Sequence, residues 1–485
     1  MLILATLAVP LLAGLFALVV SWRAAVGWLS AGSAIAVLAL GIGLCVETES
    51  HHAVNALGGT LRADSLSSFM VIVIGAVASL ATLQTPRVME RQIGEGTTSR
   101  RHASSYVVLM QVFITCMLLA VLTANLGVLW VAIEATTIAT TFLVSHHRTK
   151  KAFEASWKYV ILCSVGIALA FLGTVLIYFA ALHAGTRLSG TASLNWTSLM
   201  AIAPHLNHGV VRLALALLVL GYGTKVGFAP THSWLADAHS QAPAPVSALM
   251  SGVLLTVAFY ALLRFKAIAD IALGPTFPRA LFLVVGLLSL VLATGMLIAQ
   301  RDLKRMLAYS SIEHMGLLAL GAAAGSPLAI AAVLLHMLGH GLTKSTLFIS
   351  SGEIAHTEGT TEMAKLRGLL ARRPLLGGVF GVGLIALLGF PPFSLFISEF
   401  TMARAEVNVG LWWVVAASLV CLGAIFASIT NHARRVLFGA GASSSVAARS
   451  LAIPLVSALV VCAVLGVSAW PLLGFLHAAA HVVAR

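Results

Sequence analysis

The chain has 485 residues, of which 59% are hydrophobic and only 9% are charged, whereas a soluble domain carries about 25% charged residues. Apolar runs of about 18 residues or more recur from end to end, and each can cross a hydrocarbon core of about 30 Å as a helix. This composition excludes a soluble enzyme and a disordered tail. The net charge of +13 does not indicate a nucleic-acid partner, because the basic residues form short clusters between the apolar runs, where they orient membrane helices.

Apolar windows and the breaks between them predict an all-α polytopic membrane protein with about fourteen transmembrane helices. The first twenty residues lack a basic leader and a clear cleavage site, so we interpret them as a retained helix rather than a signal peptide. The boundaries carry an uncertainty of about 2–4 residues. The predicted spans are 2–20, 24–46, 66–84, 105–123, 125–145, 157–182, 209–228, 243–265, 277–299, 306–324, 327–351, 375–402, 410–432 and 451–475.

The distribution of Lys and Arg predicts that both termini lie on the periplasmic side of a bacterial cytoplasmic (inner) membrane. The inward loops then hold 19 of these residues, namely Arg23 and the clusters at 87–101, 148–158, 301–305, 365–373 and 434–449. The outward segments hold 8, namely Arg62, Arg187, Arg212, Arg264, Lys266, Arg279, Arg404 and Arg485. The two that remain, Lys225 and Lys344, fall inside predicted spans. A cation at the membrane centre costs about 3 kcal/mol, so we expect both lysines to have a partner, a cavity or a function.

Further ionisable side chains fall at membrane depth. His336, His340 and Lys344 are spaced by four residues, which places them on one face of a helix. Histidine titrates near neutral pH, and a line of such groups joined by water is typical of a proton relay. The candidate residues are Glu134, Lys225, Glu313, His314, His336, His340, Lys344 and Glu399.

Structural roles are the alternative to this interpretation. Any one Glu–Lys pair could be a structural ion pair, and the histidines could stabilise contacts between helices. A metal site is not expected, because no third His or Cys has suitable spacing. The five cysteines are far apart, each within an apolar run, so we expect small core residues rather than a redox or metal motif.

Two predicted spans contain sequences that break a helix. The seventh runs into Pro230, and the twelfth contains Pro391 and Pro392. Proline removes a backbone donor and clashes with the preceding turn, and interrupted helices in corresponding halves indicate an inverted-repeat transporter. We therefore predict a three-helix segment (1–104), two inverted five-helix repeats that each form a proton half-channel (105–267, spans 4–8, and 268–433, spans 9–13), and a C-terminal helix (434–485).

Two further stretches carry a resemblance to a known family. They are HSWLADAHSQAP at 232–243 and QRDLKRMLAYSS at 300–311. Both resemble signatures of the antiporter-like membrane subunits of respiratory complex I, a family shared with Mrp cation/proton antiporters and energy-converting hydrogenases. The continuation SIEHMG at 311–316 is most similar to the F component of hydrogenase-4-type complexes. The resemblance covers nearly the whole chain.

The resemblance implies roles for individual residues. Glu134 matches the family's fifth-helix glutamate and Lys225 its seventh-helix lysine, a coupled pair whose separation sets the proton affinity of the lysine. Lys344, with His336 and His340, resembles the central relay of the eleventh helix, and Glu399 matches the terminal residue of the twelfth. Many relatives carry a lysine or histidine in the eighth helix where this chain has Thr256, which can order a water molecule but cannot hold a charge.

These matches predict a proton path through the chain. A proton from the cytoplasm would reach Lys225, pass near His239 and Thr256 through water, continue to the eleventh-helix relay, and leave through Glu399. At an effective dielectric near 20, an ion pair of Glu134 and Lys225 at about 4 Å is worth about 4 kcal/mol. That is enough to switch the lysine between its protonated and neutral forms.

The chain itself is expected to hold no redox centre and no cofactor. It shows no Gly-rich nucleotide loop after a strand, no cysteine cluster for iron–sulfur and no flavin motif. If the resemblance holds, a [NiFe] centre and iron–sulfur clusters belong to partner subunits of an oxidoreductase complex, in which this chain is a translocase subunit. The expected partners are other membrane subunits, a peripheral redox or zinc-containing module, the lipid bilayer and protons.

Three alternative functions stay open from the sequence. The first is an Mrp-like Na⁺/H⁺ antiporter subunit, with Na⁺ as coupling ion. The second is the membrane subunit of an inorganic-carbon uptake complex, paired with a zinc protein. The third is a scaffold with a degenerate channel, for which Thr256 is the main support.

Overall fold

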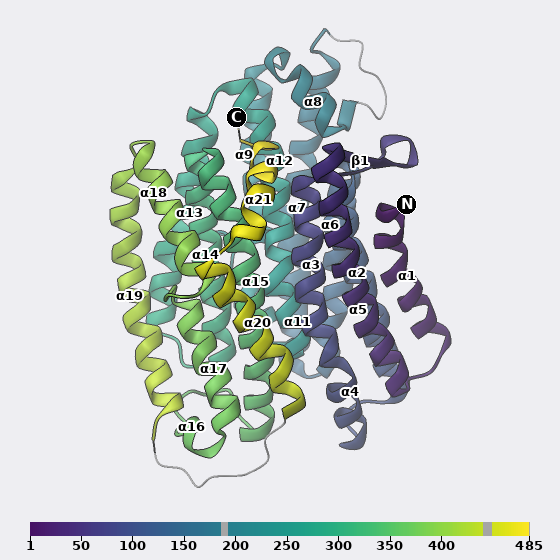
Figure 1. Cartoon of the computed structure of the whole chain (residues 1–485), viewed down its shortest axis with the longest axis vertical. Helices are drawn as coiled ribbons and strands as arrows, with labels where there is room; N and C mark the ends of the chain where they lie inside the picture. The colour runs from purple at the N-terminus through teal and green to yellow at the C-terminus, as the bar shows by residue number, and fades with distance from the viewer. Residues whose placement is uncertain (186–192, 440–448, 485) are drawn as a thin grey trace.

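The computed structural model of the chain describes residues 1–185, 193–439 and 449–484 (Figure 1). Nearly all of these residues lie in long helices that run along the long axis of the molecule. The all-α membrane fold predicted from the sequence is confirmed. Arg187 and Arg485, two of the basic residues predicted to face outward, lie outside the described residues.

The N-terminal segment contains helices and one β-hairpin. Its turn includes Gly58 and Gly59, with φ of 63° and 87°, a backbone conformation that glycine adopts without steric cost. The hairpin was not predicted, because its four-residue strands are shorter than an apolar window. The elements are α1 (Leu2–Val19), α2 (Ala24–His51), β1 (Ala53–Ala56), β2 (Leu61–Asp64), α3 (Ser65–Leu83) and α4 (Thr85–Gly94).

The middle of the chain contains the first broken helix. Helix α9 ends at Val226 and α10 begins at Trp234, with Pro230 in the interruption. One π-helical turn, Met250–Leu254, joins α11 to α12 into a single long helix. The elements are α5 (Arg100–Leu122), α6 (Leu126–Val144), α7 (Lys150–Leu182), α8 (Trp196–Ile202), α9 (His208–Val226), α10 (Trp234–Gln241), α11 (Ala244–Leu249) and α12 (Leu255–Leu273).

The last part of the chain contains the second broken helix. Helix α17 ends at Leu387 and α18 begins at Ser394, with Pro391 and Pro392 between them. The elements are α13 (Thr276–Ile298), α14 (Leu303–Ala324), α15 (Pro327–Glu358), α16 (Leu369–Arg372), α17 (Pro374–Leu387), α18 (Ser394–Asn408), α19 (Trp412–Leu437), α20 (Arg449–Val467) and α21 (Trp470–His481).

The turn between α14 and α15 shows how a glycine ends one helix and a serine begins the next. Gly325 has a φ of 72°, which ends α14 without strain. The hydroxyl of Ser326 accepts a hydrogen bond from the N–H of Ala329 at 3.2 Å and so caps α15. A two-residue turn therefore holds α14 and α15 side by side, and these two helices carry most of the predicted relay.

Within the described residues, 11 helices are long and apolar enough to cross a membrane, or 12 if α20 and α21, bent by 78°, form one span. Helix α14 is not among them, because Glu313 and His314 interrupt its apolar sequence. Helices α17 and α18 have 14 and 15 residues, so each alone is too short. The multi-pass fold is thus established, while the count of fourteen and the inverted repeats stay predictions.

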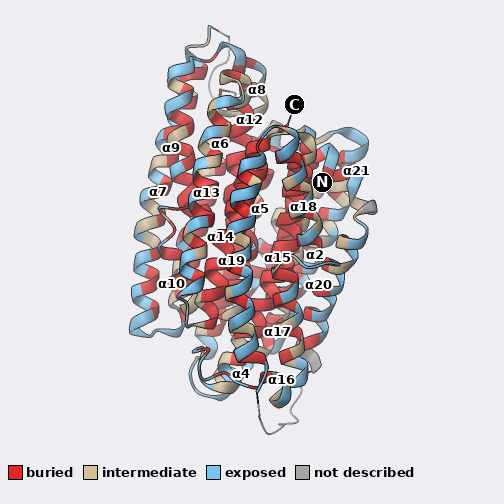
Figure 2. Cartoon of the chain, turned by 90° about the vertical axis from the view of Figure 1, so that its left-hand side faces the viewer, coloured by how far each residue is buried: buried red, intermediate tan, exposed pale blue. Residues whose placement is uncertain are grey.

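The core of the molecule is built around two helical segments. The hydrophobic stretch of Ala244–Leu273 is 100% buried and that of α15 is 94% buried. Figure 2 shows buried residues along α14 and α15 in the middle, and exposed residues on the outer face of α7 at the edge. The outer face of α7 carries apolar side chains such as Trp157 and Val165, as expected where lipid replaces water.

Three basic residues that the sequence assigned to outward or inward segments are buried in the structure. Arg264 and Lys266 were predicted to lie in an outward segment and Lys304 in an inward one, but their exposed fractions are 1%, 4% and 8%. Arg264 and Lys266 lie within α12 because this helix continues to Leu273, eight residues beyond its predicted end, whereas the side of the membrane predicted for them stays a prediction.

Arg264 has a buried carboxylate as its partner. Its Nη2 donates to both carboxylate oxygens of Asp64 at 2.8 Å and to Ser67 Oγ at 3.0 Å. Its Nε donates to the Tyr260 hydroxyl at 3.0 Å, and the guanidinium lies 4.1 Å from the ring centroid of Trp196. The hairpin, α3, α8 and α12 are thus tied together by one buried charge pair.

The two ends of the bundle differ in the elements that close them. Helices α4 and α16 lie at the lower end in Figure 1, and α8 and the β-hairpin at the upper end. Both termini lie in the upper half of that view. The predicted orientation, which stays a prediction, would place α4 and α16 in the cytoplasm.

Candidate functional site

Lys225 is the centre of a first cluster of polar side chains. It is fully buried in the last turn of α9. Its Nζ donates to Thr137 Oγ1 of α6 at 2.8 Å and to the Tyr159 hydroxyl of α7 at 2.6 Å. The Thr137 hydroxyl in turn donates to Glu134 Oε2 at 3.1 Å, and Ser164 Oγ donates to Glu134 Oε1 at 3.0 Å.

The expected direct contact of Glu134 with Lys225 is replaced by a bridge. Within the described part of the chain no ion pair joins the two residues, and the Thr137 hydroxyl lies between them. Thr137 follows Glu134 by three residues on the same helix, so its position on the same face could have been read from the sequence. Tyr159 belongs to another helix, and no signal in the sequence connects it with Lys225.

The interruption after α9 is closed within the protein. Trp234 Nε1 donates to the Thr224 carbonyl at 2.8 Å, and the N–H of Phe228 donates to the Gly223 carbonyl at 2.8 Å. These bonds satisfy carbonyls that the end of α9 would otherwise leave free, as a helix end in a membrane requires. Gly227, with a φ of 89°, makes the turn that leaves Lys225 at the end of the helix.

His239 and Thr256, which the predicted path includes, are hydrogen-bonded to neither cluster within the described residues. His239 is buried in α10; its Nδ1 contacts the Leu235 carbonyl at 2.8 Å, and its Nε2 has no hydrogen-bond partner among the described residues. Thr256 is buried in α12 and donates to the Val253 carbonyl at 2.9 Å. Among the described residues, no hydrogen bond through His239 or Thr256 therefore connects the two clusters.

Lys344 begins the second cluster. Its side chain is fully buried in α15, and its Nζ donates to the Leu307 carbonyl at 2.7 Å and to the Ser310 hydroxyl, both on α14. Glu313 is buried one turn further along α14. Like Lys225, Lys344 is thus held by uncharged oxygens rather than by a carboxylate.

Three histidines form the centre of the second cluster. His314 Nδ1 and His336 Nε2 are 3.1 Å apart, and His336 Nδ1 is 3.0 Å from Ser398 Oγ of α18. The ring centroid of His340 lies 5.2 Å from that of His314 and 6.4 Å from that of His336. Neither ring nitrogen of His340 has a hydrogen-bond partner in the described part of the chain.

The hydrogen bonds assign the protons of two rings. The Ser398 hydroxyl donates to the Leu395 carbonyl at 2.9 Å, so its oxygen can only accept from His336 Nδ1. In the neutral ring His336 Nε2 is then the bare nitrogen, and the 3.1 Å contact places a proton on His314 Nδ1. The two imidazoles form a directed chain of donors that ends on α18.

Glu399 completes the second cluster. Its Oε1 lies 3.9 Å from His314 Nδ1, and its side chain is 20% exposed. The sequence suggested no metal site because it offered no third His or Cys at suitable spacing. The structure brings His314 and Glu399 to His336 from two other helices, which spacing along one helix cannot reveal.

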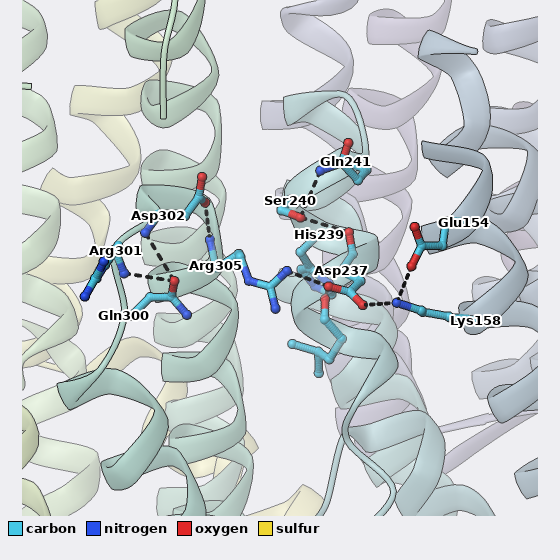
Figure 3. A network of polar contacts seen from close by, with 11 residues as sticks. Glu154, Lys158, Asp237, His239, Ser240, Gln241, Gln300, Arg301, Asp302 and Arg305 are labelled. Carbon is cyan, nitrogen blue, oxygen red and sulfur yellow. Dashed lines mark hydrogen bonds and ion pairs between the residues drawn. The ribbon is translucent and has the colours of Figure 1, made fainter. Parts of the chain in front are cut away.

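The two stretches that resemble family signatures meet at Asp237 (Figure 3). Its carboxylate pairs with Arg305 of α14 at 2.5 Å and with Lys158 of α7 at 3.4 Å, and Lys158 also pairs with Glu154 at 2.6 Å. The side chain of Asp237 is 22% exposed and those of its partners more. Helix α10, which follows the first break, is thus linked to α7 and α14 by partly exposed ion pairs.

Replacing Asp237 by Asn is expected to lower the free energy of unfolding by about 1 kcal/mol or less, because partly exposed ion pairs contribute little. Reversible unfolding in mixed detergent micelles measures this change. Glu154→Gln serves as control and should change the stability even less. If Asp237→Asn lowered the free energy of unfolding by more than about 3 kcal/mol, the ion pairs of Asp237 would contribute more than partly exposed pairs do.

A cavity of about 350 Å³ opens near the end of the bundle that holds α4. Arg87 and Arg91 line it and pair with Glu353 at 3.1 and 2.9 Å. His147 and Lys304 also line it, and Lys304 Nζ donates to the Ala242 carbonyl between α10 and α11 at 3.1 Å. Titratable side chains thus line this cavity from the surface toward the segment that holds His239.

Comparisons with known proteins agree with this architecture. Residues 123–426 match the family model described as NADH:quinone oxidoreductase/Mrp antiporter, transmembrane region. The chain is 37% identical over 403 residues to the hydrogenase-4 component F homolog of Methylacidiphilum infernorum, covering 82% of this chain and 83% of that protein.

Solved structures share the fold over nearly the full length. A chain of the archaeal membrane-bound sulfane sulfur reductase is 24% identical, with a TM-score of 0.88 and coverage of 99% of this chain and 97% of that one. A chain of respiratory complex I from Thermus thermophilus is 23% identical, with a TM-score of 0.83 and coverage of 100% and 99%. At these identities the likeness concerns the fold alone.

Proposed function

The chain belongs to the NADH:quinone oxidoreductase/Mrp antiporter transmembrane family, and on this basis we propose that it translocates protons as a membrane subunit of a hydrogenase-4-like, redox-driven complex. It is an antiporter-like, multi-pass membrane subunit. The proton path, the coupling ion and the partner module are the proposal. The proposed location is the bacterial cytoplasmic membrane with both termini in the periplasm.

The observation that carries the proposal is the way Lys225 is held. Its ammonium donates to two hydroxyl groups, Thr137 and Tyr159, and a hydroxyl can either accept from an ammonium or donate to a neutral amine. The Thr137 hydroxyl proton is committed to Glu134. The Tyr159 hydroxyl, however, can turn to donate to the neutral amine, so Lys225 can lose its proton and still keep a hydrogen-bond partner. Arg264 differs, because its guanidinium is fixed on the carboxylate of Asp64 and always keeps its charge.

The Thr137 hydroxyl supports a coupling between Glu134 and Lys225. It accepts from Lys225 Nζ and donates to Glu134 Oε2, so a change at the carboxylate reaches the ammonium through one oxygen. Movement of Glu134 toward Lys225 would favour the protonated lysine, and movement away would favour release of the proton. Glu134 is only half-buried, so a neighbouring subunit can reach it.

The second cluster supports an outlet for protons through α14, α15 and α18. A proton accepted at Lys344 would pass His340, with both nitrogens unpartnered among the described residues, and then the ordered pair His314 and His336. Glu399 is partly exposed and forms the exit. The cavity lined by Lys304 and His147 supports access from the α4 end, and water near Thr256 has to carry the proton between the two clusters.

The atoms at the centre of the second cluster favour protons over Na⁺ as the transported ion. Hard cations take oxygen ligands, whereas the centre of the second cluster consists of imidazole nitrogens. The proposed energy source is a redox module with a [NiFe] centre and iron–sulfur clusters on partner subunits, since this chain is expected to hold no cofactor. A zinc-containing peripheral module co-purifying with the chain would instead favour inorganic-carbon uptake.

The bridge at Thr137 provides a test of the proposal. Thr137→Val keeps the shape of the side chain but removes the hydroxyl, and a lost buried hydrogen bond costs about 1–3 kcal/mol. Proton translocation should fall roughly tenfold, measured as dye quenching in inverted membrane vesicles with intact assembly.

Thr137→Ser keeps the hydroxyl and is the matched control, for which we expect at least half of the activity to remain. Unchanged translocation in the Thr137→Val complex would exclude a role for the bridge. It would favour the scaffold alternative if replacement of Lys225 also had no effect.

A further inference from the structure

Three side chains from three helices converge on one point in the second cluster. They are His314 of α14, His336 of α15 and Glu399 of α18. One nitrogen or oxygen of each lies within 4.8 Å of the others, with His314 Nδ1 3.1 Å from His336 Nε2 and 3.9 Å from Glu399 Oε1. From this convergence we infer that the chain binds a divalent transition-metal ion of the Zn²⁺ class at these three residues.

The spacing fits a tetrahedral ion after small side-chain movements. Bonds of about 2.0–2.2 Å to imidazole nitrogen and carboxylate oxygen place tetrahedral ligand atoms roughly 3.3 Å apart. Two of the separations, 3.1 and 3.9 Å, lie on either side of that value, and the third, between His336 and Glu399, is within 4.8 Å. The two histidines are held on packed helices, and the third ligand is a flexible glutamate at the edge, so the site can close around an ion.

A second group orients one of the ligands. Metal-bound histidines usually donate their other ring N–H to a fixed acceptor. His336 Nδ1 donates to Ser398 Oγ, whose own proton is committed to the Leu395 carbonyl. This arrangement leaves the Nε2 lone pair of His336 directed at the centre of the cluster.

His340 is a further polar side chain beside the proposed site. It is completely buried, and both of its ring nitrogens lack a hydrogen-bond partner among the described residues. Buried polar atoms are nearly always satisfied, so this ring is expected to face a water molecule or an ion. Two histidines and one glutamate leave a fourth position for water, and His340 lies beside both histidine ligands.

The donor set selects the class of ion. Two imidazoles and one carboxylate suit Zn²⁺ and its neighbours in the first transition row, whereas Mg²⁺ and Ca²⁺ require mostly oxygen ligands. Glu399 is the ligand nearest the surface, with a side chain that is 20% exposed. Its carboxylate lies over the interruption between α17 and α18, where a Cβ at Gly389 would be 2.6 Å from Glu399 Oε2.

An ion bound at this site would also affect proton transport. This effect rests on the proposed function, whereas the binding of the ion does not. An ion between His314 and His336 takes the place of the proton they share, so no proton could pass along this pair. Zn²⁺ would then inhibit translocation. Absence of binding would leave the predicted effects of substitutions at Lys225 and Thr137 unchanged, so the two proposals can fail separately.

The test uses the intact complex, purified in mild detergent, freed of loosely bound metal by a chelator and titrated with Co²⁺ or Zn²⁺. We expect the wild-type complex to bind one more ion per copy of this chain than the Glu399→Gln complex, with the visible absorption of tetrahedral Co²⁺. His336→Gln should weaken binding by more than about 100-fold, and Ser398→Ala by about 10–100-fold.

His183→Gln, on an exposed histidine at the end of α7, is the matched control and should bind as the wild type does. Co-purification of the partner subunits establishes assembly of each variant. If the His336→Gln complex does not assemble, the comparison of the wild-type and Glu399→Gln complexes decides the test. Glutamine has nearly the same volume as glutamate, so this variant is expected to assemble. Equal binding by the wild-type and Glu399→Gln complexes, or no additional ion in the wild type, overturns the inference.

Discussion

Replacing Lys225 by Ala is expected to reduce proton translocation by the assembled complex at least about 100-fold. Lys225 is the only basic side chain that the first cluster offers between Glu134 and Thr256 within the described residues. The hydroxyls of Thr137 and Tyr159 can relay a proton but cannot store one near neutral pH. Proton uptake into inverted vesicles, driven by the electron donor of the complex and normalised to its amount, measures the effect.

Two control variants separate a proton carrier from a structural lysine. Lys225→Arg keeps a buried cation and hydrogen-bond donors, but a guanidinium does not release its proton. This variant should therefore assemble with its partner subunits but should not translocate protons. Lys266→Ala removes another buried lysine, one that pairs with Asp270 at 2.6 Å outside the cluster, and should keep most of the activity. Normal translocation in the Lys225→Arg complex would refute the proposed role of Lys225.

Replacing Arg264 by Ala is expected to lower the free energy of unfolding by about 3–5 kcal/mol, because it leaves the carboxylate of Asp64 buried without its partner. Asp64 is 3% exposed, and it also caps α3 by accepting from the N–H of Ser67 at 2.8 Å. The hairpin, α3, α8 and α12 should loosen together. Reversible unfolding in mixed micelles and the yield of assembled complex measure the loss.

A double variant separates the unpaired charge from the loss of packing. Asp64→Asn with Arg264→Gln removes both charges while an amide oxygen still caps α3, so a large part of the stability should return. Residues in one buried network show such non-additive effects. A double variant that loses as much stability as the two single variants added together would contradict the importance of charge pairing here.

The two predictions concern two kinds of buried cation in one membrane protein. Arg264 is held by a carboxylate and is expected to stay charged, which suits a structural connection. Lys225 and Lys344 are held by hydroxyl and carbonyl oxygens, which suits groups that change protonation. We therefore expect the chemistry of the partner, rather than burial alone, to distinguish a structural cation from one that carries protons.

The sequence by itself determined the membrane class and the helix breaks of this protein. Hydrophobicity and the cost of a charge in lipid act residue by residue along the chain, so they can be read without a structure. The same cost predicted that Lys225 and Lys344 would each have a partner, a cavity or a function. Proline likewise acts on its own backbone, and interruptions at Pro230 and at Pro391 and Pro392 are present in the structure.

Only the tertiary structure decided which of these residues meet. Thr137 bridges Glu134 and Lys225, and Arg264 finds Asp64, 200 residues away in the chain. His314 and Glu399 reach His336 from other helices, whereas Thr256 stays apart from both clusters. Such contacts depend on how helices rotate and pack against one another, and packing between distant segments leaves no periodic signal in the sequence of either one.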